Sequence, residues 1–307
     1  MLFLLETVVS GLLAGVMYSL VALGFVLIFK ASGIFNFAQG VFALFAGLAL
    51  YDFIADDGWF YHMFGFVLPV WAGIIATMGV MIIVAWLVEF LVLRHLVNQE
   101  PIILFMSTIG LAYFLEGLGD TLFGSDVKPL DIGLPHGAVD FLLDDYNFYV
   151  EKLEIVAAVV AAVLVVVLAV FFQKTRIGRA LRAVADDHQA ALSVGISLRT
   201  IWVIVWSVSG FVALVAGIMW GSKSGIQFSL SLIALKALPV LILGGFTSVP
   251  GAIIGGLIIG VGEKVAEVYA GPFVGGAIEN WFAYMLALAF LLFRPQGLFG
   301  EKIIERV

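Results

Sequence analysis

The chain has 307 residues, of which 63% are apolar and only 12% are charged. An ordinary soluble domain carries about 25% charged residues, so this composition nearly excludes a water-soluble enzyme. The 22 acidic and 15 basic residues give a net charge of −7, which argues against a nucleic-acid partner, and the lack of cysteine excludes disulfides and thiolate metal sites. The composition therefore predicts a polytopic integral membrane protein.

Nine predominantly apolar stretches approach the length of about 20 residues that a helix needs to cross a bilayer. Two of them, 41–53 and 233–246, are short enough to be broken or re-entrant helices. The stretches predict an all-α membrane protein with about eight or nine transmembrane helices, in a single domain over residues 1–307. In chain order they cover residues 8–29, 41–53, 66–93, 101–123, 154–172, 201–220, 233–246, 252–266 and 277–293.

The basic residues predict the orientation in the membrane, because cytoplasmic loops are enriched in Lys and Arg. Bases cluster in 174–182 and follow the last span from Arg294 onwards, whereas the loop 124–151 is rich in acids. The acidic loop is therefore expected outside the cell, and the segment 174–198 inside. This orientation puts the N-terminus outside and the C-terminus in the cytoplasm.

The segment 32–40 (SGIFNFAQG) separates the first span from the short second one. Its glycines and amides would interrupt a helix and leave polar groups free. Non-helical backbone at membrane depth is tolerated only where protein buries it or where it lines a water-filled cavity. Asn36, Gln39 and Gly40 are therefore candidates for lining a solute path, and an ordinary turn at the membrane interface is the alternative.

A second interrupted segment, 236–251, begins at Lys236 and contains two prolines and several glycines. Short apolar segments interrupted by Gly or Pro in corresponding halves of a chain are typical of transporter binding sites. Lys236, Gly244 and Gly245 are therefore the second set of candidates for the solute path, and a Gly-rich loop with a snorkelling lysine is the alternative. The glycines at 251, 255, 256 and 260 have the spacing of closely packed helices.

The longest polar stretch on the predicted cytoplasmic side covers residues 174–198. Apolar side chains recur in it near helical spacing, with Arg179 and Arg182 between them, and Gly195 stands where a helix C-cap glycine would fall. An amphipathic helix here has two interpretations: an interfacial helix on anionic headgroups, or a docking helix for a soluble partner. Two adjacent acids in its middle count against pure attraction to an anionic leaflet.

The run GRALRAVADDHQAALSVGI (178–196) resembles the cytoplasmic loop of permeases of the branched-chain amino acid ABC importer family. Residues 11–40 and 234–263 are similar to the N-terminal and C-terminal blocks of the same family. The resemblance implies a type II-like importer permease whose loop helix docks into a groove on an ATPase subunit. The implied docking residues are Arg179, Arg182, Asp187, Ala190, Ala191 and Gly195.

The resemblance also implies the partners, which are a second related permease, two cytoplasmic ATPases and an extracytoplasmic substrate-binding protein, with membrane lipids around them. Branched-chain or other small amino acids are the implied substrates, and the inner membrane of a bacterial cell is the implied location. The chain has no G-x-x-x-x-G-K-[ST] motif for ATP phosphates, so ATP and Mg²⁺ are expected only in the ATPase subunits. No cofactor, metal site or catalytic residue is expected in the chain itself, which is not predicted to be an enzyme. The alternatives are an ion-coupled secondary transporter of small polar solutes and, less favoured, a membrane-embedded enzyme.

Overall fold

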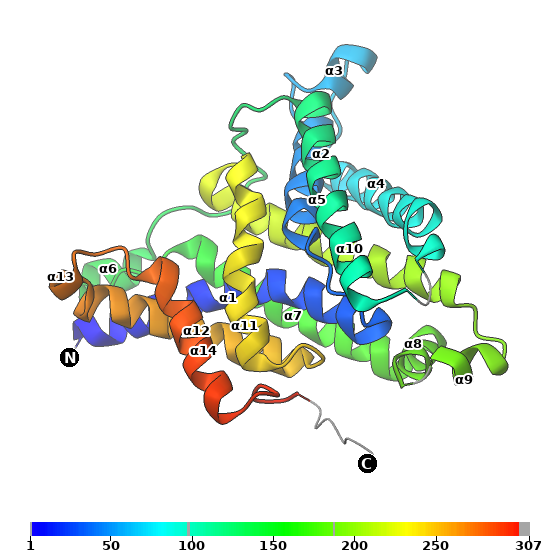
Figure 1. Ribbon diagram of the computed structural model, residues 1–307. Coiled ribbons are helices and arrows are strands. Elements are labelled where there is room, and N and C mark those ends of the chain that lie inside the picture. Colours follow the sequence, from blue (N-terminus) through cyan, green and yellow to red (C-terminus); the bar gives the residue numbers. More distant parts are fainter. Residues whose placement is uncertain (1, 97–98, 187, 301–307) are drawn as a thin grey trace. The chain divides into compact units, whose positions relative to one another are not determined.

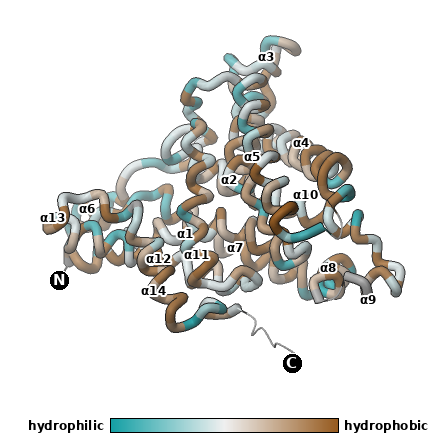
Figure 2. The backbone as a smooth tube through the Cα atoms, viewed as in Figure 1, coloured by the Kyte–Doolittle hydropathy of each residue, from teal (hydrophilic) through white to brown (hydrophobic). Residues whose placement is uncertain are grey.

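The computed structural model describes residues 2–96, 99–186 and 188–300, and these residues fold almost entirely into helices (Figure 1). Seven helices in the described part of the chain are long and apolar enough to cross a membrane. Hydrophobic residues predominate along α4 and α14, among others (Figure 2). The seven are α1 (Leu2–Ser32), α2 (Gln39–Ile54) with α3 (Trp59–Phe64), α4 (Val70–Leu91), α5 (Pro101–Phe123), α7 (Lys152–Lys174), α10 (Leu198–Ser224) and α12 (Val249–Tyr269).

Two shorter apolar helices account for the remaining two of the nine predicted stretches. Helix α11 (Ile233–Gly244) follows a 3₁₀ turn over Phe228–Leu232, and α14 (Glu279–Phe293) is the last helix. Each of the nine predicted stretches lies mainly in one of these nine helices, so the predicted all-α polytopic fold is confirmed. The remaining helices are the short α6 (Asp140–Tyr146), α8 (Arg176–Asp186), α9 (His188–Ser193) and α13 (Gly271–Val274).

Several helices begin at residues whose side chains satisfy free backbone N–H groups. The first N–H groups of a helix have no partner within it, and a hydroxyl in the preceding position can accept from one of them. Ser248 accepts from the amide of Gly251 at 3.0 Å at the start of α12. Thr175 accepts from the amide of Gly178 at 2.9 Å at the start of α8.

The chain forms two compact units, and neither is continuous in sequence. The first unit comprises Met1–Val26, Gly133–Val163 and Ile233–Val307, and the second comprises Leu27–Ile132 and Leu164–Leu232. The helices α1 and α7 each contribute one part to either unit. The prediction of one permease domain over residues 1–307 stays a prediction.

In the first unit, glycines let helix α12 approach two neighbouring helices. A Cβ atom on Gly255 would lie 2.6 Å from the carbonyl oxygen of Val240 in α11, and one on Gly256 would lie 2.7 Å from the carbonyl oxygen of Gly15 in α1. Distances below 3.0 Å leave no room for a side chain, so only glycine permits these contacts. The predicted small-residue face is therefore confirmed, and it packs within the chain.

In the second unit, α2 lies at the centre of the core. Every residue from Gln39 to Asp52 is buried, which is typical of a helix that has protein on all sides. The main neighbours of α2 are α10, α4, α5 and the 3₁₀ turn over Phe228–Leu232. Gly217 in α10 packs directly on the backbone of Ala43, where a Cβ atom would overlap the Ala43 carbonyl oxygen. The polar N-terminal end of α2 is thereby held inside the protein.

Candidate functional site

The helix break predicted over residues 32–40 is present in the second unit, between the end of α1 at Ser32 and the start of α2 at Gln39. Gly33 adopts a left-handed conformation (φ = +67°), which glycine reaches without steric cost. The Ser32 hydroxyl donates to the carbonyl of Ile28 at 2.7 Å and accepts from the amide of Ile34 at 3.2 Å. The chain can therefore leave the helix without exposing its polar backbone groups.

The side chains of Asn36 and Gln39 are buried within the second unit, with exposed fractions of 0% and 1%. Asn36 Nδ2 donates to Gln39 Oε1 at 3.4 Å, and Asn36 Oδ1 accepts from the amide of Ala38 at 3.1 Å. The hydroxyl of Ser209 in α10 donates to Gln39 Oε1 at 2.8 Å, and Gln39 Nε2 donates to the Ser209 carbonyl at 3.4 Å. Gly40 is buried beside them. Protein therefore satisfies these amides directly.

Thr108 of α5 also hydrogen-bonds to the backbone of this break. Its Oγ1 accepts from the amide of Phe37 at 3.1 Å and donates to the carbonyls of Phe35 at 3.1 Å and Phe105 at 2.8 Å. Sequence reasoning missed Thr108 and Ser209, whose only signal was a small polar residue within an apolar span.

Lys236 lies in the first unit and forms a buried ion pair with Glu263. The pair joins α11 to α12, with 3.7 Å between Lys236 Nζ and Glu263 Oε2. The Lys236 side chain is 26% exposed and that of Glu263 only 1%. Tyr18 of α1 hydrogen-bonds to the Glu263 carboxylate, and its ring centroid lies 5.6 Å from Lys236 Nζ. Within the described residues, the buried Glu263 Oε1 has no hydrogen-bond partner.

Helix α11 contains Pro239 in its interior, where a proline removes one backbone hydrogen bond. The missing N–H would have bonded to the carbonyl of Leu235, four residues earlier. The Tyr284 hydroxyl of α14 donates to that carbonyl instead, at 2.6 Å. This hydrogen bond explains how a proline-interrupted helix is stable here.

Gly244 and Gly245 form the turn from α11 towards α12. The backbone of Gly244 packs directly against that of Gly251. Gly245 has φ = +101°, and a Cβ atom there would lie 2.7 Å from the amide of Gly300. Both glycines are thus needed for close backbone approach in this structure, and their place on a solute path stays a prediction.

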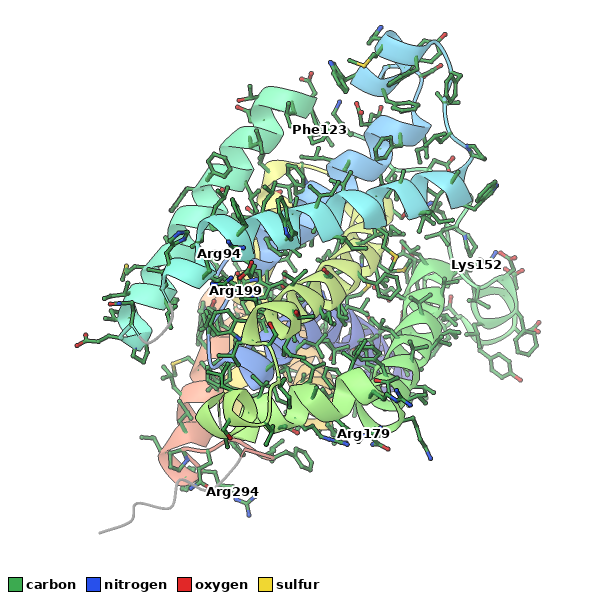
Figure 3. All side chains as sticks on the ribbon, turned by 90° about the vertical axis from the view of Figure 1, so that its right-hand side faces the viewer. Arg94, Phe123, Lys152, Arg179, Arg199 and Arg294 are labelled. Atoms are coloured by element: carbon green, nitrogen blue, oxygen red, sulfur yellow. The ribbon has the colours of Figure 1, made fainter. Side chains whose placement is uncertain are left out.

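The segment 174–198 forms the predicted amphipathic helix. Leu181 and Val184 of α8 are buried, whereas Arg179 and Arg182 are exposed, and Arg179 extends from the outer side of α8 in Figure 3. Two other apolar side chains of this segment are exposed. Ile177 is 39% exposed and Leu192 is 52% exposed, so neither lies on the buried side.

Gly195 ends α9 in the way that the sequence predicts for a C-cap glycine. Its φ is +84°, the amide of Ile196 donates to the Ala191 carbonyl at 3.0 Å, and its own amide donates to the Leu192 carbonyl at 3.0 Å. These two hydrogen bonds define a Schellman motif. A Cβ atom on Gly195 would meet nothing within 4 Å. The glycine is therefore required by its backbone conformation.

The implied docking residues differ in their accessibility. Ala190 is exposed, whereas Ala191 is 2% exposed and is covered by the chain itself. Asp187 lies outside the described residues. Beside Leu192, Val194 is 74% exposed, so the end of α9 presents two apolar side chains. In the described part of the chain, no group of three or more His, Asp and Glu residues could hold a metal ion.

The family described as "Branched-chain amino acid transport system / permease component" matches residues 7–294. The chain belongs to this family. The resemblance predicted from three sequence runs is thereby confirmed, and with the apolar helices it establishes a multi-pass membrane permease.

Named relatives match over almost their whole length. The chain is 27% identical to the high-affinity branched-chain amino acid transport system permease protein LivH of Escherichia coli K12, over 100% of this chain and 98% of that protein. It is 28% identical to BraD of Pseudomonas aeruginosa, over 99% and 98% of the two chains. A solved structure of PsaBC from Streptococcus pneumoniae in complex with Fab has a TM-score of 0.45 and 14% identity, over 92% and 89%. A likeness of that size locates no site residue.

Proposed function

We propose that the chain is the transmembrane permease subunit of an ATP-driven importer of branched-chain or other small amino acids in a bacterial inner membrane. The match of the permease family to residues 7–294 is the observation that carries this proposal. The partners are a second related permease, two cytoplasmic ATPases and an extracytoplasmic substrate-binding protein. ATP and Mg²⁺ bind in the ATPases, since the chain has no phosphate-binding motif of its own.

Asn36, Gln39 and Gly40 of the second unit stay candidates for contact with the solute, and so, independently, do Lys236, Gly244 and Gly245 of the first. Ionisable residues inside membrane spans are costly and commonly mark solute or ion pathways. Glu263 lies in the interior of α12, and replacing a buried ion pair by apolar residues is often neutral or stabilising. Stability alone therefore gives little reason for the Lys236–Glu263 pair.

An amino acid is a zwitterion, and the ion pair offers both complementary charges. The carboxylate of the amino acid can bind the Lys236 ammonium. The ammonium of the amino acid can bind the Glu263 carboxylate, whose Oε1 has no hydrogen-bond partner among the described residues. The two side chains neutralise each other when no solute is bound. In this proposal the Lys236–Glu263 ion pair is replaced, while the amino acid passes, by two ion pairs between these side chains and the two ends of the amino acid.

The partners and the energy source can be tested together. The tagged chain is purified in mild detergent from its native membrane, and co-purifying proteins are identified by mass spectrometry. The purified complex is then reconstituted, and leucine uptake is measured with ATP inside the vesicles and no ion gradient. ATP-dependent uptake is expected. Uptake that requires a Na⁺ or H⁺ gradient, with no ATPase co-purifying, would replace the proposal by the secondary transporter.

The proposed orientation makes a prediction about surface labelling. Asp140 in the acidic loop has an 80% exposed side chain, and Arg182 of α8 is exposed as well. A cysteine at Asp140 should react with a membrane-impermeant thiol reagent added to whole cells, whereas one at Arg182 should react only after lysis. The chain has no other cysteine, so the signal is unambiguous. Labelling of Arg182→Cys in intact cells would reverse the orientation.

The segment that contains α8 and α9 is the proposed docking site for the ATPases. Exposed bases on α8 and exposed apolar side chains at Leu192 and Val194 give it the composition of a protein interface, with an apolar centre and a charged rim. ATP binding would bring the two ATPases together, move these loops and change which side of the membrane the permease opens to.

A further inference from the structure

A groove in the second unit lies between α4, α7 and α10. Its volume is about 400 Å³, within the usual range of ligand pockets. Among the described residues that line it, the only polar side chain is that of Ser207, whose hydroxyl donates to the carbonyl of Val203 at 2.7 Å and is therefore already satisfied. Residues that line it include Met78 and Ile82 of α4, Val167 and Phe171 of α7, and Val203 and Ser207 of α10.

The position of the groove favours a hydrocarbon occupant. All three helices are candidate membrane spans, so lipid is the surrounding solvent. An apolar void that is left empty loses van der Waals contacts on all its walls, and apolar groups bind readily in such sites. The groove therefore fits a flexible apolar chain and has nothing to offer a polar solute.

A single acyl chain fits this groove better than a whole helix does. An α-helix with its side chains is about 10–12 Å across, so it would place only some of its side chains in a groove of about 400 Å³. A single acyl chain is much thinner and can follow the groove along its length.

Two bases lie on helices that line the groove, each close in sequence to residues of the lining. Lys174 follows Phe171 by three residues and Val167 by seven, so it shares their face of α7. Arg199, labelled in Figure 3, precedes Val203 by four residues on α10. Both side chains are exposed, and among the described residues neither forms an ion pair with a carboxylate. Each base therefore extends the groove-lining face of its helix by about one turn.

We propose that this groove binds one acyl chain of an anionic phospholipid, whose phosphate contacts Lys174 and Arg199. Arginine can hold a phosphate with two parallel hydrogen bonds, and lysine adds a mobile point charge. Near a membrane surface, each base favours an anionic over a neutral lipid by about fivefold. The proposal concerns a lipid site and does not depend on the transported solute.

The test compares two lipids on the complete chain, purified with whatever partners it retains. Phosphatidylglycerol and phosphatidylcholine with identical acyl chains are titrated, and bound lipids are counted by native mass spectrometry. The wild type should retain one phosphatidylglycerol more tightly than phosphatidylcholine. Lys174→Gln and Arg199→Gln should each reduce this preference about fivefold. Lys30→Gln, which removes an exposed base outside the groove, should not change it.

A matched pair of tryptophan variants tests the groove itself. Val167→Trp fills the groove and should abolish tight binding of either lipid, whereas Val166→Trp, at a 62% exposed position on the same helix that does not line the groove, should bind as the wild type does. Unchanged lipid binding by Val167→Trp overturns the proposal. Loss of the second permease from Val167→Trp with lipid binding intact would overturn it too, and would assign the groove to a subunit contact.

Discussion

Replacing Lys236 with methionine should abolish amino acid uptake and lower the stability of the purified protein. The change leaves the Glu263 carboxylate buried, at 1% exposure, without its counter-charge. Removing one partner of a buried ion pair costs about 3–5 kcal/mol, and we expect the lower end because Lys236 is partly exposed. Glu263→Gln should have a smaller effect on stability, because an amide is neutral and can still bond to Tyr18. Thermal unfolding and leucine uptake measure the two effects separately.

The double variant Lys236→Met/Glu263→Leu separates a structural role from a role in transport. It removes both charges, so its stability should return close to that of the wild type. Uptake should stay lost, because both of the charges proposed to bind the ends of an amino acid are removed. Wild-type uptake by the double variant would show that the ion pair has a structural role and no role in transport. That outcome would leave the proposal of an ATP-driven importer intact, because co-purification and ATP dependence test it independently.

Replacing Leu192 and Val194 with glutamate should release the ATPases from the purified complex and stop uptake, while the permease stays folded. Both side chains are exposed, with fractions of 52% and 74%, so their replacement disturbs no packing within the chain. Losing apolar contacts at the centre of an interface typically costs about 2 kcal/mol or more, which is roughly a thirtyfold loss of affinity. The measurement is the amount of ATPase that co-purifies with the tagged chain, alongside its unfolding temperature.

Gly195 provides the control for this experiment. Its left-handed backbone conformation can be adopted by asparagine with little strain but not by a β-branched residue. Gly195→Asn should therefore retain the ATPases, whereas Gly195→Val should distort the end of α9 and release them. Ala191→Trp is a poor probe of the docking surface, because Ala191 is buried within the chain and a larger side chain would disturb the loop itself. If the Leu192→Glu/Val194→Glu variant retains the ATPases, the docking proposal is wrong, and α8 and α9 lie at the membrane interface instead.

Features that depend on neighbours in sequence could be predicted from the sequence. The apolar stretches identify all nine long or apolar helices, because helices that face lipid must be apolar along a whole span. The break before α2 and the glycine cap at Gly195 are likewise local, since each depends on backbone conformations that glycine favours. The amphipathic period of the segment 174–198 and its motif likewise predict the proposed docking segment from the sequence.

The contacts of the candidate site depend on residues that are distant in sequence, and only the tertiary structure decided them. Gln39 bonds to Ser209, which is 170 residues away, and Glu263 meets Tyr18 of the first helix. Which alanine of the docking segment is covered, Ala191 rather than Ala190, also follows from packing. In an apolar sequence almost every face of a helix can be buried, so composition does not say which faces meet. The decision comes from close backbone approach at glycines and from buried polar groups, each of which must find a partner across helices.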